Sequence, residues 1–486
     1  MPPSVTTVAI DKLSEDILVE IFDAYRQLFE SNPNYENIWN SRDGWFKLTH
    51  VCRSWRRLVH LSPFRLHVHL LLTPRRSSKA IMLRNLPPFP ILVHYQRAKW
   101  TKREMGLALA AIGHHGRVRG ISLERRPSRD MAEIYKALNR PFPDLETLEI
   151  CSNYGLSSVI IPATFLLGSA PCLRRLKLEH VDPRCLSPLL STVSGLVELS
   201  LLIGIPPDTL PEESFIANLQ RMSCLRRLAL ELRYHHTIIG YSPQPPSRTG
   251  DIVPLPSLTQ LVFYGQHVYL EALMAVLGAP SLQHLSVGVL DATNTISIPH
   301  LCRFICDTDH QFREFHLDVT DNRLGIVADS EMCSKFIYLK PFKIIIPGPV
   351  SLEEICNRLS GPLATVETLT MVWQVIGERR SVKWRKIFNH TRRLKFILVP
   401  WQVALDVVHS FQQDGQGLDM ELLPDLEIIN MDMTPWHPGG GSRLGPNDQD
   451  HVSIPDAFEP LIAARKKVGR PITLSSSTGH PSRYAV

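Results

Sequence analysis

A short hydrophobic pattern recurs along most of the chain. It has the form Φ-x-x-Φ-x-Φ, with Φ a large apolar residue, and first appears as Leu145-Glu-Thr-Leu148-Glu-Ile150. Apolar residues at alternate positions are typical of a strand with one buried face. The copies begin at Leu145, Leu173, Leu196, Leu225, Leu258, Leu282, Phe312, Val366, Leu394 and Leu426. They start 23 to 33 residues apart, except for 54 residues after Phe312, which we interpret as two repeats with a degenerate strand at 340–346.

Many of these strands follow a proline-containing phrase, as in Phe142-Pro143-Asp144 and Ala279-Pro280-Ser281. Proline cannot continue a helix, and the residue before it favours extended backbone, so the phrase separates a helix from the next strand. Helix-like stretches occupy the intervals, at 213–222, 269–277, 352–359 and 404–411. One strand and one helix per repeat predict an α/β fold, a curved solenoid with parallel strands inside and helices outside.

The repeats resemble irregular leucine-rich repeats over residues 115–435. That family usually places Asn or Cys in the turn after each strand. Here only Asn153 fits, while Val181, Gly204 and Arg233 stand at equivalent positions. We therefore expect each turn to be closed differently, with irregular curvature.

The N-terminal segment predicts a small helical module. Ser14 can cap a helix whose first turn carries Glu15 and Asp16, where the helix dipole favours carboxylates. A second block, 45–59, places one apolar stripe along a helix that ends at Ser62-Pro63. The stripe consists of Leu48, Val51, Cys52, Trp55, Leu58 and Val59. So few residues cannot bury this much apolar surface alone, which indicates either a partner or a helical cap over the next domain.

This module is similar to the F-box motif, through Leu13-Ser-Glu-Asp-Ile17-Leu18-x-x-Ile21-Phe22 and Leu48-x-x-Val51-Cys52-Arg53-x-Trp55-Arg56. Ser62-Pro63-x-x-Leu66, the segment ending at Pro87 and the strand-like stretch that follows it at 90–95 resemble the large F-box family of higher fungi. The resemblance implies docking on a Skp-type adaptor and, through it, a cullin. The residues expected at that contact, or in the packing beneath it, are Leu13, Ile17, Leu18, Ile21, Val51 and Trp55.

These patterns divide the chain into six segments. We expect a flexible N-terminus (1–9), an F-box-like helical domain (10–65), a connecting or capping region (66–114) and the repeat solenoid (115–435). A Gly/Pro linker (436–450) and a C-terminal cap with a disordered tail (451–486) follow, the cap comprising a helix at 454–467 and a strand at 472–475.

Composition narrows the functional classes. A net charge of +6 spread over 486 residues is too dilute for a dedicated nucleic-acid binder. The N-terminus lacks the order of a secretory signal, and the longest uncharged stretch, 151–173, contains Pro162 and Pro171, so no membrane helix is expected. Nine scattered cysteines indicate buried free thiols in a reducing compartment. The sequence therefore favours a cytoplasmic or nuclear protein.

No phosphate-binding loop, nucleophile elbow or metal helix motif occurs in the sequence, so no catalytic residue and no cofactor is expected. The best metal-like cluster, His300-x-Cys302-x-x-x-Cys306-x-x-x-His310, lies in an apolar helix and is interpreted as core rather than as a zinc site. His114-His115 and His235-His236 have no partner at ligand spacing. Arg465-Lys-Lys467 has two interpretations, a nuclear-import signal and a solvated helix end, and the shortness of the run favours the solvated helix end.

Residues between the repeat hydrophobics should face the concave side of the sheet. The residues expected to contact a protein target are Arg175, Lys177, Glu198, Arg227, Tyr264, Glu314, His316 and Asp318. The alternative is a plain solvated face. We expect a non-catalytic substrate receptor of an SCF-type ubiquitin ligase, with a non-degradative interaction scaffold as the alternative and an enzyme with a novel site as a third class.

Overall fold

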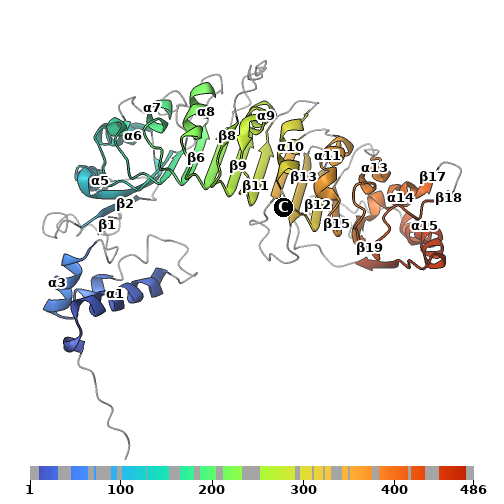
Figure 1. Ribbon diagram of the computed structural model, residues 1–486, viewed down its shortest axis with the longest axis horizontal. Coiled ribbons are helices and arrows are strands. Elements are labelled where there is room, and N and C mark those ends of the chain that lie inside the picture. The colour runs from blue at the N-terminus through green and yellow to red at the C-terminus, as the bar shows by residue number, and fades with distance from the viewer. Residues whose placement is uncertain are drawn as a thin grey trace, which may run out of the picture. The chain divides into compact units, whose positions relative to one another are not determined.

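The computed structural model describes residues 10–30, 45–63, 70–72, 89–95, 101–126, 128–152, 165–179, 186–203, 212–232, 252–290, 296–308, 311–320, 323–329, 342–347, 351–374, 382–413, 417–432 and 448–477. They form a mixed α/β fold with mostly parallel strands (Figure 1). The chain divides into two compact units, Met1–Leu225 and Arg226–Val486. Asn153, Val181, Gly204, Arg233, His235, His236 and His310 lie outside the described residues, as do the segments 1–9 and 478–486.

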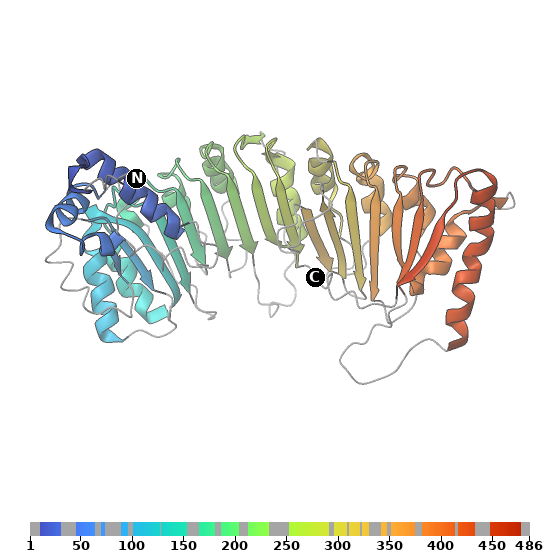
Figure 2. The same cartoon turned by 90° about the horizontal axis from the view of Figure 1, so that it is seen from below.

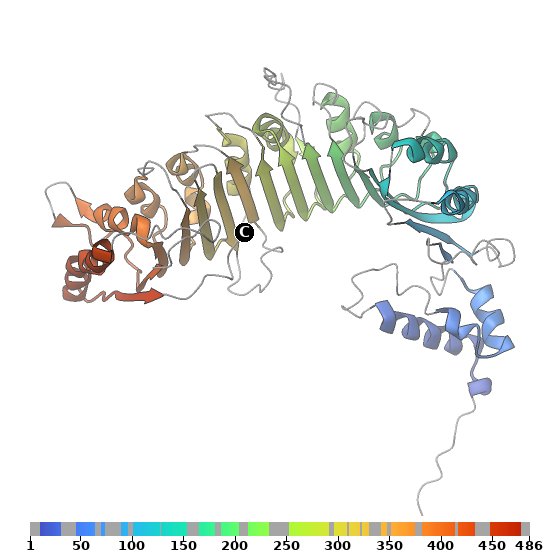
Figure 3. The same ribbon diagram turned by 180° about the vertical axis from the view of Figure 1, so that it is seen from behind.

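The first unit starts with helices and continues as a parallel sheet. The helices are α1 (Glu15–Glu30), α2 (Trp45–Leu48), α3 (Arg53–Leu61), α5 (Lys102–Ile112), α6 (Ser128–Ala137), α7 (Leu186–Leu190) and α8 (Glu212–Gln220). Single 3-10 turns are η1 (Ile10–Lys12), η3 (His115–Arg117) and η4 (Phe165–Gly168). The strands β1 (Leu70–Leu72), β2 (Ile91–Tyr95), β3 (Val118–Arg126), β4 (Thr147–Ser152), β5 (Arg175–Glu179) and β6 (Glu198–Ile203) lie in chain order. Helices α5 to α8 cover one face of this sheet (Figures 1 and 3).

The sheet begins earlier than the sequence predicted. Leu70 pairs in parallel with Ile91, and β2 pairs in parallel with β3. The segment 66–114, predicted as a connecting or capping region, therefore already supplies two strands and helix α5. The strand-like stretch at 90–95 is confirmed as β2, whereas β1 was not predicted. Strand β2 does not show the Φ-x-x-Φ-x-Φ pattern. All five of its residues are buried, so it has no exposed positions at which polar residues would alternate with apolar ones.

The second unit repeats the same plan. Its helices are α9 (His267–Val276), α10 (Pro299–Asp307), α11 (Leu352–Arg358), α12 (Ser360–Leu363), α13 (Trp384–Phe388), α14 (Trp401–Ser410) and α15 (Asp448–Lys467). The main sheet contains β7 (Arg227–Leu232), β9 (Gln260–Gly265), β11 (His284–Val289), β12 (Glu314–Thr320), β13 (Arg323–Asp329), β14 (Phe342–Pro347), β15 (Thr368–Gln374), β16 (Phe396–Pro400), β19 (Ile428–Asp432) and β20 (Thr473–Ser477). Short pairs are β8 (Val253–Pro254) with β10 (Leu277–Gly278), and β17 (Gln412–Gln413) with β18 (Gly417–Leu418). The strands form one layer with the helices behind it (Figure 2).

The interval between β12 and β15 departs from a simple repeat. The spatial order is β11-β14-β13-β12-β15, so the chain runs backwards through three strands before it continues. The degenerate strand predicted at 340–346 is confirmed as β14, parallel to β11. However, β13 was not predicted, and it is antiparallel to both β12 and β14. The interval is therefore an inserted three-strand meander rather than two consecutive repeats.

The repeat hydrophobics stack in register to form the core. In the first unit Leu148 pairs with Leu176, and Leu176 with Leu199. The second unit continues this way, for example from Leu369 to Ile397. All five side chains are buried. Full burial of one such side chain stabilises the fold by about 1.5–3 kcal/mol, so each added repeat gains most of its stability from its neighbours.

The proline-containing phrases separate helix from strand, as predicted, and the structure shows that they do so as tight turns. Leu145 N donates to Phe142 O at 3.3 Å, and Leu282 N donates to Ala279 O at 3.2 Å. A second recurring bond joins consecutive repeats, since Arg174 N donates to Glu146 O at 2.8 Å. These bonds satisfy backbone groups that a strand entering a sheet would otherwise leave buried without a partner.

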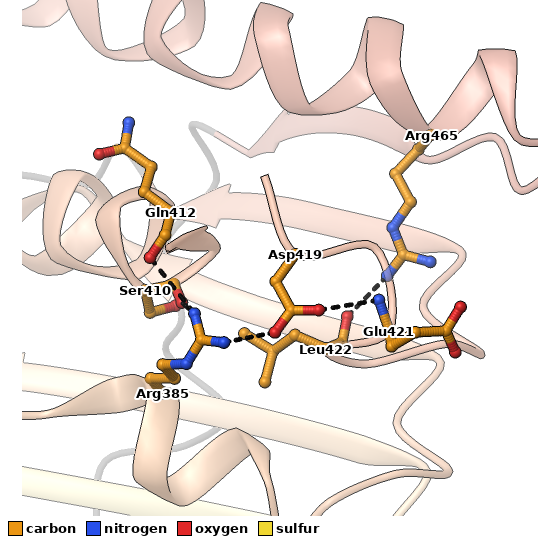
Figure 4. A network of polar contacts seen from close by, with 7 residues as sticks. All are labelled: Arg385, Ser410, Gln412, Asp419, Glu421, Leu422 and Arg465. Carbon is orange, nitrogen blue, oxygen red and sulfur yellow. Dashed lines mark hydrogen bonds and ion pairs between the residues drawn. The ribbon is translucent and has the colours of Figure 1, made fainter. Parts of the chain in front are cut away.

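The C-terminal cap is confirmed as a helix and a strand, α15 and β20, although α15 begins at Asp448 and so includes the last three residues of the predicted linker 436–450. The Arg465 side chain is completely buried and donates to the carbonyl oxygen of Leu422 at 2.9 Å (Figure 4). It also donates to the carbonyl oxygen of Leu423. Leu423 has a φ of 55°, an unusual conformation for leucine. Next to it Arg385 forms an ion pair with Asp419. Arg465 therefore holds α15 against the turn that precedes β19, and the prediction of a solvated basic run that includes Arg465 is wrong.

Candidate partner-binding surfaces

Helix α1 begins where the sequence predicted. Ser14 Oγ accepts a hydrogen bond from the Ile17 backbone nitrogen at 3.4 Å, and Glu15 and Asp16 lie in the first turn. This is the arrangement of an N-cap serine with acidic residues near the positive end of the helix. The cap fixes the phase of the helix, and with it the direction of Ile17 and Ile21.

The second helical block is broken, contrary to the single stripe predicted. Helix α2 ends at Leu48, and α3 begins only at Arg53, with Cys52 as its N-cap in extended conformation. Cys52 Sγ accepts from the Trp55 backbone nitrogen at 3.4 Å, and Arg56 Nε donates to the Thr49 carbonyl oxygen at 2.9 Å. These bonds hold the break. As a result Val51 and Cys52 point to solvent and do not share a stripe with Leu58 and Val59.

Two of the residues expected at an adaptor contact pack against the core of the module. The rings of Phe22 and Trp55 lie 4.6 Å apart at an angle of 58°, and Leu18 is buried. Phe22 itself is only 1 % exposed. Leu18 therefore supports the surface from beneath, while Trp55 and Leu13 are half-buried and lie between the core and the surface.

The other three are exposed apolar side chains. Ile17 is 49 %, Ile21 41 % and Val51 59 % exposed. Ile17 and Ile21 are four residues apart and share one face of α1. Sequence reasoning missed two further exposed residues, Ile10 at 46 % and Leu61 at 67 %. Both stand just outside the motif-like stretches, so the only signal for them was an apolar residue next to a helix end.

In the first unit, charged residues on the sheet face opposite the helices pair with each other. We call this face the open face in each unit. Arg175 Nε lies 3.3 Å from Glu198 Oε1 on the adjacent strand, and Lys177 Nζ lies 3.0 Å from Glu179 Oε1. Arg175 and Glu198, two of the residues predicted for this face, thus pair with each other, while Lys177 pairs with a neighbour on its own strand. Because their charges are largely compensated, they present little net field to a partner.

The second unit also carries its predicted residues on the open face. Asp318 Oδ2 lies 3.0 Å from Arg323 of the unpredicted strand β13, and His316 Nε2 lies 3.6 Å from Glu314 Oε2. Burial raises the pKa of the Asp318 carboxyl, although Arg323 opposes the shift. Arg227 is exposed on β7.

The ring of Tyr264 on β9 packs over Gly288, a residue without a side chain, on the neighbouring strand β11. A Cβ atom built on Gly288 would stand only 2.2 Å from Tyr264 Cδ1. The Tyr264 hydroxyl lies 3.4 Å from Ser286 Oγ. The aromatic ring therefore covers β11 on the open face, and its position depends on the missing side chain of Gly288.

Sequence reasoning missed an uncharged patch at the end of the open face. Phe396 and Leu398 on β16 pair in register with Ile428 and Asn430 on β19, and Ile428 is 36 % exposed. The signal was present, since β16 reads Phe-Ile-Leu-Val-Pro and is apolar at both alternating positions. Such a strand has apolar side chains on both faces of its sheet.

The cysteines divide into two classes. Cys302 and Cys356 are buried, and burial raises the pKa of each thiol to about 12. Cys306 is exposed, and its thiol donates to the Arg358 carbonyl oxygen at 3.1 Å. Cys52, Cys172 and Cys224 are also exposed, so the expectation of mainly buried thiols is wrong for them. Within the described residues no three His, Cys, Asp or Glu side chains gather as metal ligands.

No model of a known protein family matches the sequence, and no curated protein matches it. Among the described helices none is long and apolar enough to cross a membrane.

Proposed function

We propose that this chain is the non-catalytic substrate receptor of an SCF-type ubiquitin ligase. The N-terminal helices bind a Skp-type adaptor, which links the chain to a cullin, and the open face binds a protein target. The observation that carries the proposal is the set of exposed apolar side chains Ile17, Ile21 and Val51 on a module whose own core is already formed by the buried Leu18 and Phe22, with Trp55 packed against Phe22. Solvent-exposed apolar groups that the module cannot bury indicate a protein partner.

The proposed mechanism is proximity. An irregular leucine-rich-repeat surface holds a target near a ubiquitin-loaded conjugating enzyme. This raises the effective concentration of the target lysines at that enzyme. This role requires binding and geometry from the chain but no chemistry of its own. The extended row of open-face side chains on stacked strands supports it.

The test is copurification of a Skp-type adaptor and a cullin with the full-length chain and with Ile17→Asp/Ile21→Asp. Both isoleucines are exposed, so the substitutions leave the core intact but place carboxylates in the proposed contact. We expect the amount of copurified adaptor to fall at least about tenfold, because burying an unpaired charge in the contact is strongly unfavourable. Leu405→Asp is the matched control, since Leu405 is 37 % exposed on α14. Equal capture by all three forms contradicts the proposal.

A scaffold that binds the same partners without ubiquitination is the alternative, and measuring the lifetime of the captured target distinguishes it from a receptor. For a receptor, the Ile17→Asp/Ile21→Asp chain prolongs the lifetime of the captured target. For a scaffold, that lifetime is unchanged although the adaptor is lost.

A further inference from the structure

One face of helix α3 concentrates positive charge. Arg53, Arg56, Arg57, His60 and Leu61 follow the spacing i, i+3, i+4, i+7 and i+8, so they share a single face of the helix. They line a surface hollow of about 330 Å³. We call these five residues the arginine face.

The charges of the arginine face are uncompensated within the described residues. Arg53 and Arg57 are exposed, and neither forms an ion pair or a side-chain hydrogen bond with any described residue. Helix α3 contains no acidic residue. Like charges four residues apart lower the stability of a helix, so this arrangement works against the fold of α3 itself. Burial, with a smaller contribution from Arg56, lowers the pKa of His60, so the charge comes from the arginines.

The arginine face also contains an exposed aliphatic side chain. Leu61 is 67 % exposed, while Leu58 and Val59 on the opposite side of α3 are buried. The arginine face therefore offers an apolar contact beside its charges. Guanidinium groups bind carboxylates in a bidentate geometry, and an exposed leucine gains from contact with another apolar group.

The spacing fits an extended chain better than a compact anion. Arg53 and Arg57 are four residues apart, which is about 6 Å along a helix axis, and Leu61 lies about 6 Å further. In an extended segment, side chains on one side recur about every 6.6 Å. Two carboxylates and one aliphatic group at alternate positions therefore match the arginine face in order and distance.

We propose that the arginine face of α3 binds an extended acidic segment of a partner protein. Two acidic side chains at alternate positions pair with Arg53 and Arg57, and an aliphatic side chain two residues further covers Leu61. The proposal rests on α3 alone and does not depend on whether the module binds a Skp-type adaptor.

The test uses the full-length chain and a fluorescein-labelled peptide of the repeating form Glu-Thr-Glu-Thr-Leu, followed by fluorescence anisotropy. We expect saturable binding that weakens as salt is added, because exposed charges are screened. A peptide with Gln in place of Glu should bind at least about tenfold more weakly. Arg53→Glu/Arg57→Glu should likewise lose at least about tenfold in affinity for the acidic peptide.

Two controls keep the result interpretable. Arg392→Glu/Arg393→Glu makes the same change at two adjacent exposed arginines elsewhere, and it should keep the wild-type affinity. Arg53→Gln/Arg57→Gln removes the charge without introducing carboxylates on α3, and it should still lose several-fold, with unchanged circular dichroism.

Three outcomes would overturn the proposal. They are absence of peptide binding by the unaltered chain, equal affinity of all variants, and tight binding of inositol hexakisphosphate that the acidic peptide does not displace. The last would identify a compact polyphosphate as the occupant. None of them bears on adaptor capture, so failure here and failure of the proposed function are distinguishable.

Discussion

Cys302 and Cys356 are buried thiols on the neighbouring helices α10 and α11, and burial raises the pKa of each to about 12. Only the thiolate reacts with alkylating agents, so both should be inert in the native protein. We expect iodoacetamide at about pH 8 to label Cys52, Cys172 and Cys224 and to spare Cys302 and Cys356 until urea is added. Mass spectrometry of the digested protein reads each site. Labelling of Cys356 at the rate of Cys172 would contradict this assignment.

The same shifts predict a direction of alkaline destabilisation. An unfolded thiol loses its proton near the ordinary value of 9.0, whereas the native thiols hold theirs to about 12. The native pKa is higher than the unfolded one, so the native state binds more protons between these values. The contribution is therefore fully present below about pH 9 and decreases as the pH rises towards 12. We therefore expect the free energy of unfolding, measured with urea, to fall less between about pH 9 and pH 12 in the Cys302→Ala variant than in the unaltered protein.

At the scale of the elements, β9 and β11 are joined by an aromatic ring lying over a glycine. A Cβ at position 288 would overlap Tyr264, so Gly288→Ala must push the ring away from the sheet. We expect a loss of about 1–3 kcal/mol in the free energy of unfolding, which is typical of an overpacked site. Urea titration measures it.

A double-mutant cycle separates this contact from a general preference for glycine in the strand. In a Tyr264→Ala background the alanine at 288 has no ring to displace, so its effect should fall close to zero. An equal loss in both backgrounds would mean that the backbone of Gly288, and not the ring, sets the effect.

The elements show which parts of the fold were predictable. The strands β4, β5 and β15 follow from leucines whose burial recurs at fixed spacing. Strand β13 was missed because Leu324, Ile326 and Ala328 alternate in a segment that lacks the repeat pattern. Asp321-Asn322, two turn-forming residues before it, were the available signal for a hairpin. The reversed order of β12, β13 and β14 depends on long-range pairing, which no local pattern encodes.

The candidate surfaces were predictable only in part for a similar reason. The apolar residues of the N-terminal module were found from helical spacing, but which of them are exposed depends on the break at Cys52. That break comes from a thiol and the Arg56 side chain closing on the backbone, and the motif itself does not show it. The same limit applies to the charges of the open face, since Arg323 reaches Asp318 from a strand that the repeat pattern omits.

At the scale of the whole molecule, stacked repeats draw stability from their neighbours, so a repeat at the end of a stack, which has a neighbour on one side only, depends on a cap. In the second unit α15 and β20 close the stack, and Arg465 fastens α15 to the turn at Leu422 and Leu423. Removal of this side chain should therefore loosen the end of the unit and leave strands further inside protected. The uncharged but similarly long methionine tests this with little change in volume.

Arg465→Met leaves two buried carbonyl oxygens without their donor, and we expect a local loss of about 2–4 kcal/mol. Hydrogen exchange should show faster exchange in α15, β19 and β20, with β12 and β15 unchanged. Arg470→Met is the matched control, because Arg470 is exposed and lies 3.4 Å from an exposed Glu421 carboxylate. Removing this surface ion pair should lower the free energy of unfolding by no more than about 0.5 kcal/mol. Uniformly faster exchange across the second unit would show instead that its repeats unfold as one cooperative block, in which the cap is not a separable element.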